Sequence, residues 1–210
     1  KSCALIGLEG VLIDVEVDVH RGQIGRFDMV GLPGAAVQES RERVRSAIVN
    51  SGLQFPQQRV TVNLAPGDLR KDGPAFDLPI AVGILSGSNQ LPLEFADSIF
   101  IGELSLDGSL RHVNGIISMA SHAREQGIEI AYVPAVDAPE AALVPGLQVI
   151  PVTSLAELAM HLNNLMLIEP CNADTSADLD LLKPEYASDF SEIRGQEHVK
   201  RALEVAAAGG

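Results

Sequence analysis

The sequence contains no tryptophan, only two cysteines, and no apolar run of the roughly 18–20 residues that a membrane-spanning helix needs. Cys3 and Cys171 are far apart and have no CxxC or Cys/His spacing, which argues against a zinc site and a disulfide framework. We therefore expect a protein of the reducing cytoplasm with no membrane partner. The chain begins without methionine, which indicates a trimmed start, and its first residues alternate like a strand and not like a signal peptide.

Basic residues are scarce: the sequence has 15 lysines and arginines and 28 aspartates and glutamates, so its net charge is −13. A free-standing duplex-DNA-binding protein needs a basic footprint, so this balance argues against that class. Residues 169–192, however, hold seven acids and one base, so the rest of the chain is only mildly acidic. A local basic face is possible there.

The one basic cluster comprises Arg41, Arg43, Arg45, Arg59 and the stretch LRK at 69–71. Arg41 and Arg45 are one helical turn apart and share a face, so they are the candidate contacts to a DNA phosphate backbone. Glu39 and Glu42 interleave with them, and a solvated, salt-bridged helix face is the alternative interpretation.

Hydrophobic periodicity predicts the fold class. Period-two alternation and short apolar runs predict two strands within 3–22, strands at 25–34, 59–66, 129–134 and 147–152, and a hairpin at 98–115 with Asp-Gly at its turn. Helical patterns occur at 35–52, 75–88, 115–127 and 154–164, the last with a Ser154/Glu157 capping box. Hairpins mixed with β–α units predict an α/β (α+β) fold, a mixed β-sheet with packed helices.

The chain divides into three parts by composition. Residues 1–168 carry the periodic segments, and 169–188 are acidic, polar and aperiodic, which predicts a linker. Residues 189–210 resume a helical period but are too short to fold alone, so they indicate the truncated start of a second domain.

The stretch RKDGPAFDLP at 70–79, with GELSLDG at 102–108 and NGII at 114–117, resembles the proteolytic domain of Lon-type proteases over roughly residues 10–160. The resemblance implies a Lon proteolytic-domain-like fold, that of ribosomal protein S5 domain 2. It puts the serine nucleophile at Ala75 and the lysine base at Ile117. Alanine offers no nucleophilic atom and isoleucine accepts no proton, so the resemblance predicts a catalytically dead domain.

Three further features are candidate sites. The turn GLPG at 31–34 precedes a helix and could cradle an anion, although a plain turn explains it. Asp68, Asp72 and Asp77 could hold a divalent ion, but aspartates at turns and helix starts explain them more simply. The five histidines lack metal-ligand spacing, so no metal site is predicted.

The segments VGLPGAAVQESRERVRSAIVNSG and DFSEIRGQEHVKRALEVAAAGG resemble the ComM/YifB family of magnesium-chelatase-like AAA+ ATPases, over nearly the whole chain. The resemblance implies a hexameric full-length protein that uses ATP and Mg²⁺, acting as a DNA helicase in branch migration during natural transformation. It implies an adenine pocket at Ile193, Gly195 and Gln196. No GxxxxGK[ST] phosphate loop occurs in these 210 residues, so no cofactor is expected for this chain alone.

The sequence is therefore compatible with three classes of function. The first is the non-catalytic N-terminal domain of an AAA+ DNA motor, with a role in assembly or substrate engagement. The second is a Lon-like peptidase that uses other residues. The third is the ATPase subunit of a metal chelatase, which has only the family label in its favour.

Overall fold

The computed structural model describes residues 1–20, 25–93, 95, 97–172 and 195–209. The chain forms two compact units, Lys1–Ala173 and Asp174–Gly210. Most of the predicted acidic linker, residues 173–188, lies outside the described residues. The second unit contains helix α6 (Glu197–Gly209), as the helical period of the last residues predicts.

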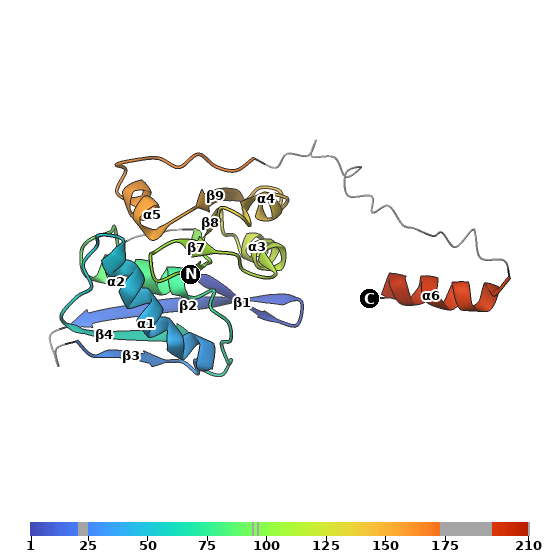
Figure 1. Ribbon diagram of the computed structural model, residues 1–210, viewed down its shortest axis with the longest axis horizontal. Helices are drawn as coiled ribbons and strands as arrows, with labels where there is room; N and C mark the ends of the chain where they lie inside the picture. The colour runs from blue at the N-terminus through green and yellow to red at the C-terminus, as the bar shows by residue number, and fades with distance from the viewer. Residues whose placement is uncertain (21–24, 94, 96, 173–194, 210) are drawn as a thin grey trace. The chain divides into compact units, whose positions relative to one another are not determined.

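A four-stranded mixed sheet forms the base of the first unit (Figure 1). Its order is β1-β2-β4-β3, with β3 parallel to β4 and the other pairs antiparallel. The strand bounds are β1 Ser2–Ile6, β2 Glu9–His20, β3 Phe27–Val30 and β4 Arg59–Ala65. In β4 every second residue is buried, which is the one-faced burial that its alternating sequence predicts.

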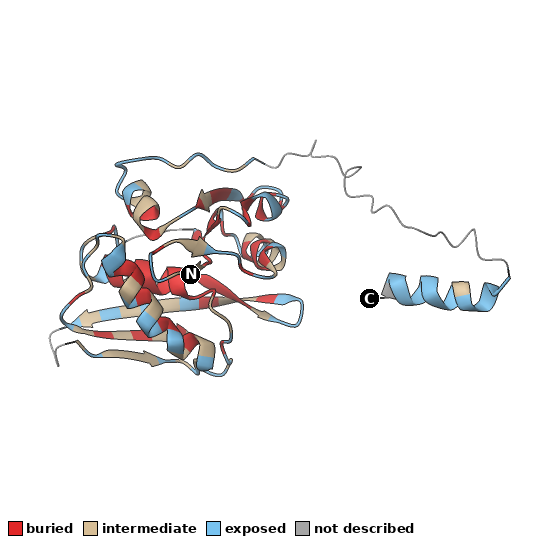
Figure 2. Cartoon of the chain, viewed as in Figure 1, coloured by how far each residue is buried: buried red, intermediate tan, exposed pale blue. Residues whose placement is uncertain are grey.

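Helices α1 (Ala35–Asn50) and α2 (Asp77–Gly87) pack against each other over this sheet (Figure 1). The apolar face predicted for the first helix is fully buried: Val37, Val44, Ala47 and Ile48. Helix α2 is buried on nearly all sides, as its almost continuous apolar sequence predicts (Figure 2).

Close packing of α2 on β2 depends on a glycine. A Cβ at Gly83 would lie 2.4 Å from Cγ2 of Val17 on β2, and valine is stiff at this torsion. We expect Gly83→Ala to lower the free energy of unfolding by about 1–3 kcal/mol through overpacking, despite alanine's better helix propensity. The control is Gly67→Ala, where a Cβ meets nothing within 4 Å. Urea denaturation of both variants measures the difference, and a neutral Gly83→Ala would contradict the packing argument.

A second layer holds the parallel sheet β5-β8-β9 and three helices. The bounds are β5 Ser98–Phe100, β8 Ile130–Pro134, β9 Gln148–Val152, α3 Ile116–Glu125, α4 Ala138–Ala141 and α5 Leu155–Leu162. Ser154 caps α5 by accepting a hydrogen bond from the Glu157 N–H at 3.3 Å. The expected capping box is altered, because the Glu157 carboxylate accepts from the backbone of Thr153 and not from Ser154.

The predicted hairpin at 98–115 is wrong in its first part. Residues 98–100 join the parallel sheet, and only the short strands β6 (Glu103–Leu104) and β7 (Leu110–Arg111) pair as a hairpin. The fully buried Ser98–Phe100 segment is typical of a parallel strand covered on both faces, and Phe100 stacks on Tyr132 at 4.6 Å. Within the described residues, no helix has the length and apolar character to cross a bilayer.

Candidate functional site

The loop KDGPA, residues 71–75, is hydrogen-bonded at both ends to other parts of the first unit. The Lys71 backbone pairs with the turn before α1, donating to Leu32 and accepting from Gly34 at 2.8 Å. The Lys71 side chain is fully buried, and its ammonium donates to the Pro66 carbonyl. Desolvation lowers the pKa of this lysine, and Asp68 opposes the shift. Lys71 belongs to the basic cluster predicted from the sequence, but its buried ammonium binds a carbonyl group of the preceding turn and is not available to a ligand at the surface.

Ala75 contributes to the wall of a cavity of about 230 Å³, formed by residues from distant parts of the chain. Ala75 itself is 5% exposed, and its carbonyl accepts a hydrogen bond from Gly102 at 3.0 Å. Polar groups in the wall come from Asp72, Glu103, His112 and Asn114. The position that the Lon resemblance gives to a nucleophile thus faces a preformed cavity, where it presents a methyl group.

The position given to the lysine base does not belong to this cavity. Ile117 is 39% exposed near the start of α3 and is not among the residues that line it. Cys3 does line it, but burial raises the pKa of its thiol to about 11, so at neutral pH it is a protonated, weak nucleophile. The cavity therefore offers a shape and a set of polar groups without an activated nucleophile.

His112 and Asp137 form a pair at the cavity that sequence spacing did not indicate. Nδ1 of His112 bonds to the Asp137 carboxylate, which is 2% exposed and also accepts from the Val113 N–H at 2.9 Å. Hydrogen bonds to Asp137 and then to Asn114 raise the pKa of His112. The two partners are 25 residues apart and are brought together by the turn before α4. No local signal could have found them.

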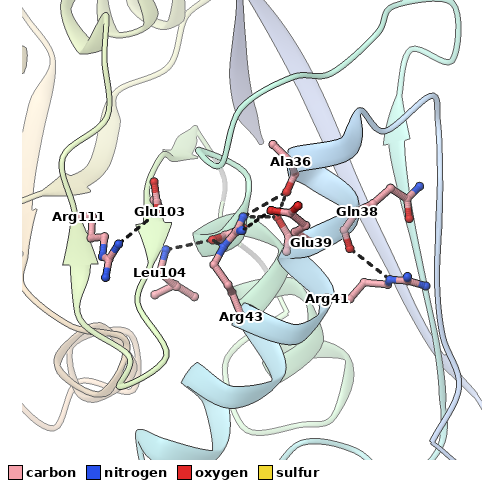
Figure 3. Close-up of polar contacts among 10 residues, drawn as sticks. Ala36, Gln38, Glu39, Arg41, Arg43, Glu103, Leu104 and Arg111 are labelled. Atoms are coloured by element: carbon pink, nitrogen blue, oxygen red, sulfur yellow. Dashed lines mark hydrogen bonds and ion pairs between the residues drawn. The ribbon is translucent and has the colours of Figure 1, made fainter.

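The basic cluster predicted around α1 is largely used inside the fold. Arg43 makes a bidentate pair with the fully buried Asp77, through Nε to Oδ2 at 2.8 Å and Nη2 to Oδ1 at 3.1 Å. It also donates to the Ala36 carbonyl (Figure 3), and Asp77 accepts from the Leu104 N–H. Arg43 thereby ties α1, α2 and β6 together, and it is structural.

Other members of the cluster are paired with acids. Arg59 bonds Asp28 at 2.8 Å across β3 and β4, and the exposed Arg70 lies 3.1 Å from Asp72. Arg41 and Arg45, in contrast, have no acidic partner among the described residues and remain exposed on α1. Arg41 donates to the Gln38 carbonyl of its own helix (Figure 3), and the Arg45 guanidinium lies 4.9 Å from the centroid of Phe55.

The turn GLPG lies close to Asp72 in the fold. A Cβ at Gly34, the residue just before α1, would lie 1.9 Å from Oδ1 of Asp72. The Asp72 carboxylate is therefore near the start of this helix, where negative charge is favourable. Asp77 is committed to Arg43, and the described residues contain no group of three His, Cys, Asp or Glu that could hold a metal.

Two of the three residues assigned to an adenine pocket are described. Gly195 and Gln196 are exposed just before α6, and the Gln196 carbonyl accepts from the Val199 and Lys200 N–H groups. Ile193 lies outside the described residues. Both described residues lie beside the start of α6, and the assignment of an adenine pocket stays a prediction.

Comparison with known proteins identifies a family and several relatives of this chain. A family model described as subunit ChlI of Mg-chelatase matches residues 15–137. The chain is 37% identical to the competence protein ComM of Haemophilus influenzae and 39% identical to YifB of Escherichia coli, in each case over 99% of its own length. It is 27% identical to the DNA repair protein RadA of Mycobacterium tuberculosis over 79% of its length. The chain spans about 40% of the length of ComM and YifB.

Proposed function

The chain belongs to the family of Mg-chelatase subunit ChlI, with ComM and YifB as relatives, and from that premise we propose that it is the non-catalytic N-terminal domain of an ATP-driven DNA motor. The observation that carries the proposal is the similarity to competence protein ComM over 99% of this chain. In the proposed motor, six copies form a ring in the cytoplasm that moves along DNA during natural transformation. This domain assembles the ring or engages the DNA.

The Ala75 cavity supports the non-catalytic part of the proposal. The loop forms part of the wall of a defined cavity, and a methyl group stands there where the resemblance expects a nucleophile. We infer that the loop is retained as architecture: Lys71 connects it to the turn before α1, and Ala75 connects it to Gly102.

ATP and Mg²⁺ do not fit the residues of this chain. The sequence has no phosphate loop, and Gly195 and Gln196 are exposed beside one helix. We therefore assign nucleotide binding in the proposed motor to the part of the complete protein outside these 210 residues.

The experiment compares the chain with the complete protein. We expect calorimetry of the 210-residue chain with millimolar ATP and Mg²⁺ to give no saturable heat, because the phosphates have no ligands. The complete protein should hydrolyse ATP, and single-stranded or branched DNA should accelerate it. A complete protein with its phosphate-loop lysine replaced is the control. If DNA does not accelerate ATP hydrolysis, the proposed motor is contradicted. If the 210-residue chain binds nucleotide, the assignment of nucleotide binding to the rest of the complete protein is contradicted.

A further inference from the structure

A wide groove of about 830 Å³ lies at the C-terminal ends of α1 and α2, away from the Ala75 cavity. Its wall includes Arg45 and Val49 of α1, Val19 of β2 and the loop 53–58. None of the described residues that line it is acidic, in a chain with 28 aspartates and glutamates. The charged side chain among these lining residues is that of Arg45, so the groove suits an anionic ligand.

Arg45 and Phe55 form a positively charged stacking surface in this groove, which we call the Arg45–Phe55 platform. The Arg45 guanidinium lies over the ring of Phe55, which packs on Phe27 at a centroid distance of 5.9 Å from its own ring. Phe55 is half-buried and fixed, whereas Arg45 is exposed. A guanidinium held on an aromatic ring presents a planar surface for stacking together with a positive charge.

Carboxamides complete the lining. Gln90 fixes the loop, since its side chain accepts from the Gln54 N–H at 2.8 Å and donates to the Gln54 carbonyl at 2.7 Å. Gln57 and Gln58, the next glutamines of the loop, are exposed at the groove. Each carboxamide offers both donors and acceptors, as the edge of a nucleobase requires.

We propose that this groove binds an unpaired nucleotide of a single-stranded nucleic acid, with the base stacked on the Arg45–Phe55 platform and its edge facing Gln57 and Gln58. Arg41 lies one turn away on the same helix, about 6 Å along its axis, and contacts a neighbouring phosphate. The inference rests on the proposed function and names where this domain meets the strand. Sequence-tolerant stacking with amide contacts fits a protein that moves along DNA.

A peptide is the other occupant that such a groove could take, because amides also bind a main chain. The observations favour the nucleotide for two reasons. The described wall carries the positive charge of Arg45 and no acid, which suits a ligand that is negative. A guanidinium on an aromatic ring is a stacking surface, and a peptide main chain has no ring to place on it.

The test uses two matched substitutions on one helix. Fluorescence anisotropy measures binding of the 210-residue chain to a labelled oligo-dT and to an abasic strand of equal length at low salt. We expect wild type to bind oligo-dT more tightly than the abasic strand. Arg45→Lys keeps the charge but removes the flat cation, so it should weaken oligo-dT binding about tenfold. Arg41→Lys makes the same exchange at the phosphate contact, so it should weaken binding of both strands to the same, smaller extent.

Each other outcome overturns the inference. Equal binding of both strands, or equal effects of Arg45→Lys and Arg41→Lys, would mean that only phosphates are contacted. Binding of unstructured casein instead of oligo-dT would make the groove a peptide site. The absence of any oligo-dT binding would remove the site altogether. None of these results decides the proposed function, which depends on DNA-stimulated hydrolysis of ATP by the complete protein.

Discussion

Replacing Arg43 with methionine should lower the free energy of unfolding by about 3–5 kcal/mol, which is the usual cost of leaving a buried charge without its partner. Asp77 is fully buried at the start of α2, and Arg43 supplies both of its short charge-assisted bonds. Methionine preserves the apolar stem of arginine but donates no hydrogen bond to the Asp77 carboxylate. The Asp77 carboxylate would keep the Leu104 N–H as a donor, which cannot neutralise it.

The loss of stability caused by Arg43→Met, which we call its deficit, should be larger at high pH than at low pH. Burial raises the pKa of Asp77 in the folded chain, while Arg43 opposes that shift. Removing Arg43 leaves burial dominant, so the folded state binds the proton more tightly than the unfolded state does. The deficit is then fully present above the raised pKa and shrinks as pH falls toward the ordinary aspartate value of about 4.

Urea denaturation at pH 8 and pH 5 measures this effect, provided that both proteins remain folded without denaturant. Arg111→Met is the matched control, because Arg111 is exposed and lies 3.8 Å from Glu103, and it should change stability by no more than about 0.5 kcal/mol. Adding Asp77→Asn to Arg43→Met should recover part of the loss and remove the pH dependence. A deficit of equal size at both pH values would show that lost packing, not the unpaired carboxylate, is responsible.

Local periodicity was enough to predict most elements of the fold. The buried face of α1 and the alternation of β4 follow directly from the spacing of apolar residues. The hairpin prediction at 98–115 failed where a tertiary contact overrides local pattern, because residues 98–100 pair with β8, some 30 residues later in the chain. Helix α4 has only four residues and gives too short a pattern to detect.

The sites were harder to predict, because the sequence shows residue types and not their partners. Helical spacing separates Arg43 from Arg41 and Arg45, but it does not show that Arg43 pairs with an aspartate 34 residues away or that Arg45 lies over Phe55. The groove at Arg45 has no acid among its described lining residues, and this becomes visible only when distant segments are brought together.

The unaltered chain should show no peptidase activity on unstructured casein and no labelling by a serine-reactive probe. Loss of the nucleophile alone costs a serine protease about 10⁶-fold in kcat. Here Ala75 supplies no oxygen, and the Cys3 thiol, with a pKa near 11, is protonated at neutral pH. Specific probe labelling, or cleavage that co-purifies with the chain, would contradict the assignment of a non-catalytic domain.

Restoring the two lost groups should recover at most a trace of activity. A serine at 75 would face the cavity, but a lysine at 117 would start from a position that is 39% exposed and outside the cavity wall. A lysine acts as a base when desolvation lowers its pKa, and an exposed one keeps its proton. Any ammonium that did reach the cavity would meet Asp72 and Glu103, whose carboxylates favour the charged form.

Probe labelling of Ala75→Ser/Ile117→Lys, with Ala75→Ser as its control, tests this account of the cavity. We expect the two to label equally slowly, since the lysine does not act as a base. Adding Glu103→Gln removes one of the carboxylates that would hold an ammonium in its charged form, so any lysine-dependent labelling should rise in that background. Rapid labelling of the double variant alone would mean that the cavity still organises a serine–lysine pair, and that only two side chains separate this domain from a peptidase.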